Sequence, residues 1–88
     1  MTVEEFAVGD LVEVVNVKPT ERRVLAGQHP WAIENGEQGI VTELYRHDFR
    51  VQCGSNAAMK WEANLRADEV RLVARLGREE ATSRLLGI

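Results

Sequence analysis

Short segments in which apolar residues alternate with polar ones constrain the fold of this chain more than any other feature. In "DLVEVVNV", residues 10–17, Val12 and Val14 fall on one face and Glu13 on the other. The same period of two returns in "MKWEA", residues 59–63. A period of two is typical of half-buried strands. The chain has 88 residues, so we expect one mostly β domain with a core of limited size.

Turn residues separate these segments into strands of similar length. "RHD" and "GSNAA" are turn-like, and each is followed by a strand-like run. We expect five strands, over residues 10–17, 39–45, 49–53, 59–63 and 69–73, and one helical turn at residues 65–68. This pattern favours a small antiparallel SH3-like barrel in which the last strand pairs with the first.

The alternation that is typical of strands is absent between the first two expected strands. The residues there that interrupt helices and strands are Pro19, Gly27, Pro30, Asn35 and Gly36. So many breakers exclude a long regular element. We expect a long loop over residues 17–38, with one helical turn in "TERRVLAG", residues 20–27. Loops of this length are uncommon in compact domains and are often functional.

The residues after the barrel indicate a helical tail. We place the barrel at residues 1–75 and the tail at residues 76–88, where Ala81, Leu85 and Ile88 recur at helical spacing. An isolated helix this short is marginal in water, so it has to dock. The sequence leaves two sites open, an open end of its own barrel, which we favour, or the surface of a partner.

The charges of the two halves of the chain differ in sign. The net charge is −3. Residues 46–88 are slightly basic, whereas the first 45 residues carry eight acids, Glu4, Glu5, Asp10, Glu13, Glu21, Glu34, Glu37 and Glu43, against Lys18, Arg22 and Arg23. This asymmetry suggests an acidic and a basic face. It does not provide the concentrated positive field of a strong nucleic-acid binder.

Several classes of site are excluded or disfavoured by residue content. Cys53 is the only cysteine, so an internal disulfide, a four-cysteine zinc site and a cysteine-ligated iron–sulfur cluster are impossible within this chain. The glycines of "NGEQG" precede a strand rather than a helix, which argues against a phosphate-binding loop. No apolar run could span a bilayer and the start lacks signal-peptide features, so we expect no membrane association and a cytoplasmic location.

The residues with catalytic or metal-binding potential form no recognisable motif. They are His29, His47 and Cys53, with Asp48 and Glu34 as neighbouring acids. Their spacing supports neither a metal site nor a Cys–His nucleophile pair. We therefore expect no catalytic residues, no metal and no cofactor, and thus a protein that is not an enzyme. Cys53 ends an expected strand and is interpreted as a small buried apolar residue.

Three stretches carry a family resemblance. "VGDLVEV" (8–14), "GEQGIVTEL" (36–44) and "NLRADEVRLV" (64–73) resemble the SH3-like barrels of the electron-transport accessory protein group. That group includes the variable subunit of ferredoxin–thioredoxin reductase, the small barrel subunit of photosystem I and the barrel region of the nitrile hydratase beta subunit. The resemblance covers about residues 6–73 and departs at the tail and at "ERRVLAGQHPWAIE" (21–34). It implies a non-catalytic subunit that docks on a larger redox or metal-containing protein.

The long loop is the expected partner-binding element. Tryptophan is favoured at binding hot spots because it offers a large contact area with few rotatable bonds, and the loop carries one. Charges of both signs accompany it. The residues that we expect to contact a partner protein are Arg22, Arg23, His29, Trp31 and Glu34.

A nucleic-acid-binding barrel of the KOW kind is the alternative. Its basic surface would consist of Arg22, Arg23, Arg46, Arg50 and Lys60. Scattered charges of this kind are more often the solvated side of strands, and few exposed aromatic residues are available to stack on bases. Nucleic acid is therefore the less favoured partner.

Overall fold

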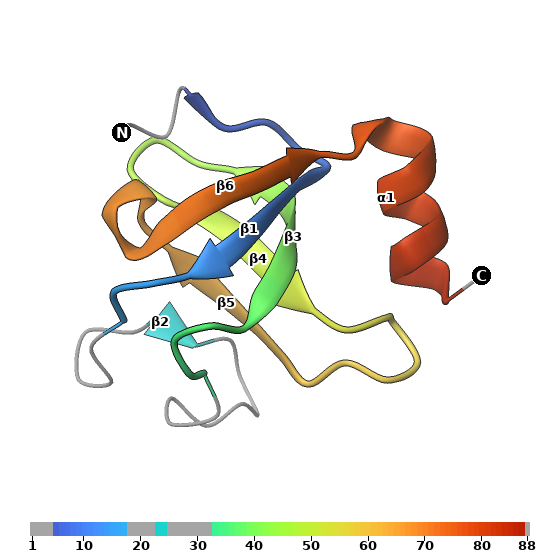
Figure 1. Cartoon of the computed structure of the whole chain (residues 1–88), viewed down its shortest axis with the longest axis horizontal. Coiled ribbons are helices and arrows are strands. Elements are labelled where there is room, and N and C mark those ends of the chain that lie inside the picture. Colours follow the sequence, from blue (N-terminus) through green and yellow to red (C-terminus); the bar gives the residue numbers. More distant parts are fainter. Residues whose placement is uncertain (1–4, 18–22, 25–32, 88) are drawn as a thin grey trace.

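The structure, a computed structural model, describes residues 5–17, 23–24 and 33–87. Within them one antiparallel sheet contains six strands in the order β2-β5-β4-β3-β1-β6 (Figure 1). The elements are β1 (Asp10–Val14), β2 (Arg23–Val24), β3 (Gln38–Leu44), β4 (Phe49–Cys53), β5 (Trp61–Leu65), the 3₁₀ turn η4 (Ala67–Glu69), β6 (Val70–Arg75) and the helix α1 (Gly77–Leu86). The expectation of a mostly β chain with a C-terminal helix is confirmed.

The observed elements correct several details of the expected pattern. The first strand, expected over residues 10–17, ends at Val14. The sheet gains the two-residue strand β2, which pairs with β5 inside the segment expected to be a loop. The helical turn expected at residues 20–27 is therefore wrong at Arg23–Val24, and its other residues lie outside the described part of the chain. The pairing of the last strand with the first is confirmed, because β6 runs antiparallel to β1.

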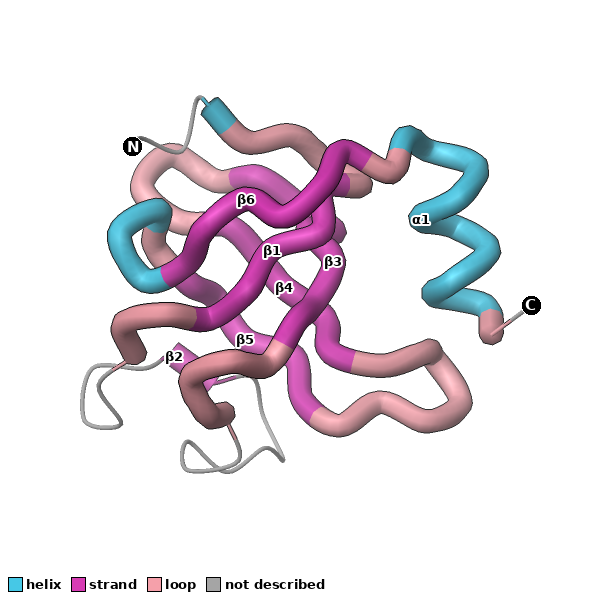
Figure 2. Tube along the Cα trace, in the orientation of Figure 1, coloured by secondary structure: helices cyan, strands magenta, loops and turns pink. Residues whose placement is uncertain are grey.

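The sheet curls around a single apolar core. In Figure 2, β1 and β6 cross in front of β4 and β5. Apolar residues from five strands converge in one cluster, with Leu72 packed at its margin: Val12, Val14, Val41, Val51, Trp61, Val70 and Leu72. The strand order leaves β2 and β6 as edges, so among the described residues hydrogen bonds do not close the sheet into a ring.

A residue that precedes β1 completes this core. Phe6 is 3% exposed and belongs to the core cluster. Its ring centroid lies 4.8 Å from that of Phe49, with the planes tilted by 48°. Such tilted aromatic pairs are favourable beyond the area that they bury. Phe6 therefore adds to the core from outside the sheet.

The helix α1 packs against the chain's own sheet. Ala81 is the buried residue of α1. A Cβ on Gly9 would lie only 3.3 Å from the Gly77 carbonyl oxygen and 3.5 Å from the Ala81 Cβ, so Gly9 permits the close approach of the helix. The Asn56 N–H donates a hydrogen bond to the Leu85 carbonyl at 2.6 Å.

Ion pairs join the acidic first half of the sequence to the basic second half. The described pairs are Asp10–Arg75 (3.0 Å), Glu13–Arg71 (3.1 Å), Glu37–Lys60 (2.7 Å) and Glu43–Arg50 (3.5 Å). These four acids therefore neutralise bases across the sheet and do not form a separate acidic face. No helix in the described ranges is long and apolar enough to cross a membrane.

Candidate functional site

The two ends of the segment 17–38 are held side by side on the sheet. The Val17 N–H donates to the Asn35 side-chain oxygen at 3.1 Å. The Gly36 N–H donates to the Val14 carbonyl at 2.7 Å, and the Val14 N–H donates to the Glu37 carbonyl at 2.8 Å. Because β1 is paired on both sides, these bonds connect the segment to a rigid part of the sheet.

The C-terminal end of the segment 17–38 is also anchored in the core. Ile33 is 2% exposed and packs in the main apolar cluster. The chain then turns at Asn35–Gly36, where Gly36 has a φ of +97° that disfavours residues with a side chain. We refer to residues 14–17 and 33–37 as the loop base.

The Glu37 carboxylate is the polar centre of the loop base. Its Oε1 accepts the Glu34 N–H at 2.8 Å, and its Oε2 lies 2.7 Å from Lys60 Nζ. Burial acts to raise the pKa of this carboxyl, but the bonds from Lys60 and Glu34 and the nearby Trp61 indole N–H outweigh it and lower the pKa. The Trp61 indole N–H itself meets no partner at hydrogen-bond distance. Glu37 therefore stays ionised at neutral pH and holds the loop base to Lys60, the residue before β5.

Cys53 is adjacent to this carboxylate. The thiol is half-buried, and its Sγ lies 3.9 Å from Glu37 Oε2. Burial raises the pKa of the Cys53 thiol, and the negative charge of Glu37 raises it further. A thiol with a raised pKa is a poor nucleophile at neutral pH. His47 precedes β4 whereas Cys53 ends it, so the strand separates the two residues of the possible Cys–His pair.

The protonated state of Cys53 leads to a labelling prediction. We expect the native protein to react slowly with iodoacetamide at pH 7, because the thiolate is disfavoured and half-buried. The same thiol is expected to react quickly in urea, where its pKa returns to the ordinary range. Mass spectrometry of timed samples measures both rates. Equal rates in the two conditions would mean that Cys53 is exposed and activated in the native state.

The expected partner-binding residues are only partly described. Arg22, His29 and Trp31 lie outside the described residues, as does the Arg23 side chain, although the Arg23 backbone belongs to β2. Glu34 is exposed at the loop base. In the ranges 5–17, 23–24 and 33–87, no three His, Cys, Asp or Glu side chains gather as metal ligands.

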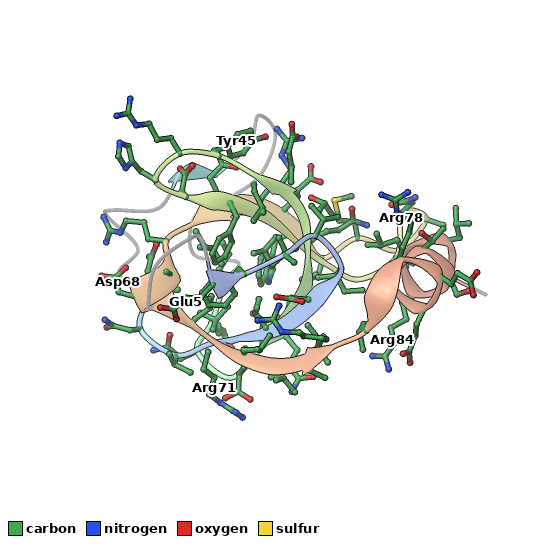
Figure 3. The ribbon with its side chains drawn as sticks, turned by 90° about the horizontal axis from the view of Figure 1, so that it is seen from above. Glu5, Tyr45, Asp68, Arg71, Arg78 and Arg84 are labelled. Carbon is green, nitrogen blue, oxygen red and sulfur yellow. The ribbon has the colours of Figure 1, made fainter. Side chains whose placement is uncertain are left out.

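The described members of the basic set do not form one surface. Arg46 is exposed in the β3–β4 turn. Arg50 pairs with Glu43, and its guanidinium lies 5.8 Å from the centre of the Tyr45 ring, labelled in Figure 3. Lys60 is paired with Glu37 at the loop base. Two of these three cations therefore already have an acidic partner.

A concave region lies between α1 and the sheet, and the sequence did not indicate it. We call this cavity of about 240 Å³ the α1 crevice. It is lined by Leu11, Gln38, Gly39, Ile40, Gln52, Gly54, Ser55 and Arg84. The only signal in the sequence was the need of the tail to dock, which does not specify the residues beneath it.

Comparison of the chain with protein-family models, curated proteins and solved structures finds no match.

Proposed function

We propose that this chain is a non-catalytic accessory or adaptor barrel that binds a partner protein through the segment 17–38. The observation that carries the proposal is the loop base, in which both ends of the segment are fixed to paired strands and Ile33 is buried. A rigid scaffold that carries a long connection with an aromatic residue is how binding modules are commonly built.

An SH3-like architecture is part of the proposal. Five strands follow the order β6-β1-β3-β4-β5, a 3₁₀ turn directly precedes β6, and the long connection separates β1 from β3. This arrangement supports the barrel expected from the sequence. The resemblance to electron-transport accessory barrels favours a redox or metal-containing enzyme as the partner, and a cytoplasmic location remains a prediction.

The chemistry of the described residues supports a binding role rather than catalysis. The Cys53 thiol has a raised pKa, and the Glu37 carboxylate is engaged by Lys60 and the Glu34 N–H. A general base or nucleophile needs a reactive protonation state and access to substrate. The most polar cluster of the loop base is therefore suited to holding the chain in place.

Replacing Trp31 by alanine tests this proposal. Affinity capture with the wild-type chain identifies candidate partners, and calorimetry then measures the affinity of a purified one. We expect Trp31→Ala to weaken that affinity by about 2 kcal/mol or more, roughly thirtyfold, as for a hot-spot residue. The melting temperature is expected to change little. Val73→Ala, at an exposed position of β6, is the control and should leave the affinity unchanged.

Two results would contradict the proposal. If Trp31→Ala unfolds the protein, the tryptophan is a structural residue. If the wild-type chain binds RNA or DNA below micromolar concentration in about 150 mM salt, the nucleic-acid alternative replaces the adaptor, because charge alone gives a Kd of only about 10⁻⁴ to 10⁻⁶ M.

A further inference from the structure

The floor of the α1 crevice is a row of side chains on the outer face of the sheet. Leu11 of β1 pairs with Ile40 of β3, and Ile40 pairs with Gln52 of β4. Paired residues of an antiparallel sheet project on the same face. Ile40 and Gln52 are 6% and 5% exposed but lie outside the core cluster. Ile40 and Gln52 are therefore buried separately from the core, and Leu11 and Ile40 give the row an apolar surface.

Gln52 presents a fixed acceptor in this floor. Its Nε2 donates to the Gly54 carbonyl at 3.1 Å and to the Asn56 side-chain oxygen at 2.8 Å. These two bonds hold the amide in one orientation, so its oxygen is the atom that can accept a hydrogen bond from a ligand. Ser55 accepts the Ala58 N–H at its Oγ, at 3.1 Å, and can donate its own hydroxyl proton.

The opposite wall of the α1 crevice carries a cation. Arg84 lines the cavity from α1 and is about half exposed. One of its terminal nitrogens lies 3.2 Å from Glu80 Oε1, one turn earlier in the helix. An exposed pair at this spacing is weak, so a carboxylate ligand can compete for the guanidinium.

We propose that the α1 crevice binds an apolar residue that carries a free carboxylate and an acylated nitrogen. Arg84 pairs with the carboxylate, the Gln52 oxygen accepts the ligand N–H, and Leu11 and Ile40 contact the apolar side chain. The volume of about 240 Å³ is below the roughly 300–1,000 Å³ of pockets for drug-sized ligands, which limits the ligand to about one residue. This chemistry occurs in N-acylated amino acids and at the C-termini of peptides.

Titration of ¹⁵N-labelled protein with N-acetyl-leucine, followed by NMR, tests the assignment. We expect the chemical shifts of Gln52, Ser55 and Ile40 to change as ligand is added, until the site is saturated. N-acetyl-leucinamide, which lacks the charge, should bind about tenfold more weakly, because the charge-assisted bond to Arg84 is lost. A short peptide that ends in leucine, titrated in parallel, distinguishes a peptide C-terminus from a small acid as the better ligand.

Three variants of α1 separate this site from general electrostatic attraction. Arg84→Gln should weaken the binding of N-acetyl-leucine about tenfold. Arg78→Gln removes the same charge from another side of the helix (Figure 3) and should leave the affinity unchanged. Glu80→Gln removes the competitor of the ligand and should tighten binding by about twofold.

Other outcomes overturn the proposal. Chemical-shift changes that do not saturate would mean that no specific site exists at α1. Equal losses of ligand affinity in Arg84→Gln and Arg78→Gln would mean the same. The two proposals are tested at different residues, Trp31 for the partner and Arg84 for this ligand, although Gln38 of the α1 crevice directly follows Glu37 of the loop base. Failure here would therefore leave the adaptor proposal intact, and an unchanged partner affinity in Trp31→Ala would not affect this one.

Discussion

Replacing Trp61 by alanine is expected to lower the free energy of unfolding by about 3–5 kcal/mol. Trp61 is fully buried and is the largest of the fully buried side chains. Its removal loses the transfer free energy of the indole and leaves a cavity in a core that holds few other large residues. A domain of 88 residues has roughly 4–13 kcal/mol of stability in total. The loss is therefore a large fraction of the total stability, and the melting temperature of the variant is expected to fall sharply.

Urea denaturation followed by circular dichroism measures this loss. Trp61→Phe is the matched control, because it keeps an aromatic ring in the core. The Trp61 Nε1–H has no partner at hydrogen-bond distance, so the phenylalanine leaves no acceptor newly unpaired and should cost clearly less. A Trp61→Ala protein with a melting temperature within a few degrees of the wild type would show that Trp61 is not central to the core.

Replacing Gly54 by alanine is expected to cost about 3 kcal/mol or more. Gly54 follows β4 with a φ of +95°, a conformation that is strained for alanine. A Cβ at this position would lie 2.4 Å from the Ala58 carbonyl oxygen and 3.2 Å from the Lys60 nitrogen, both of which are backbone atoms. The β4–β5 loop would have to shift, and overpacking of this kind adds about 1–3 kcal/mol to the strain.

The variant Gly36→Ala separates the cost of the backbone strain from the cost of the steric clash. Gly36 has a φ of +97°, but a Cβ there would meet nothing within 4 Å, so this variant carries the backbone strain without the clash. We expect it to lose about 1–2 kcal/mol. Urea melts of both variants give the comparison. Equal losses of unfolding free energy in Gly54→Ala and Gly36→Ala would mean that the β4–β5 loop adapts to the added methyl group without cost.

The period of two in the sequence predicted most of the strands because the core depends on it. β4 has the bounds that its pattern indicated. In β5 the buried residues alternate with the less buried ones as expected, but the strand starts and ends two residues later than expected, at Trp61 and Leu65. Asn64 is a turn former when judged locally, yet it stays in the strand because it pairs with Arg50 and because Leu65 is buried opposite Phe49.

Features that depend on contacts between distant segments could not be predicted from the sequence. β2 has two residues, too few for any period, and forms only because β5 is there to pair with it. Phe6 belongs to no periodic segment. The sequence shows Glu37 only as one of the eight acids of the first half, and its role at the loop base arises from the position of Lys60. The α1 crevice likewise depends on the register of three strands and on where the helix docks.

The place of β1 beside the edge strand β6 has a consequence for how the chain is synthesised. β1 pairs with β6, and the Glu13–Arg71 and Asp10–Arg75 bonds join residues 58 and 65 positions apart. At a synthesis rate of about 5–20 residues per second, β1 waits roughly 3–11 seconds before the first residue of β6 is made. During that time one of its edges is open, and open edges are sites of aggregation. Asp10 and Glu13 are then unpaired charges on this edge and act against association between nascent chains, before the arginines of β6 arrive to neutralise them.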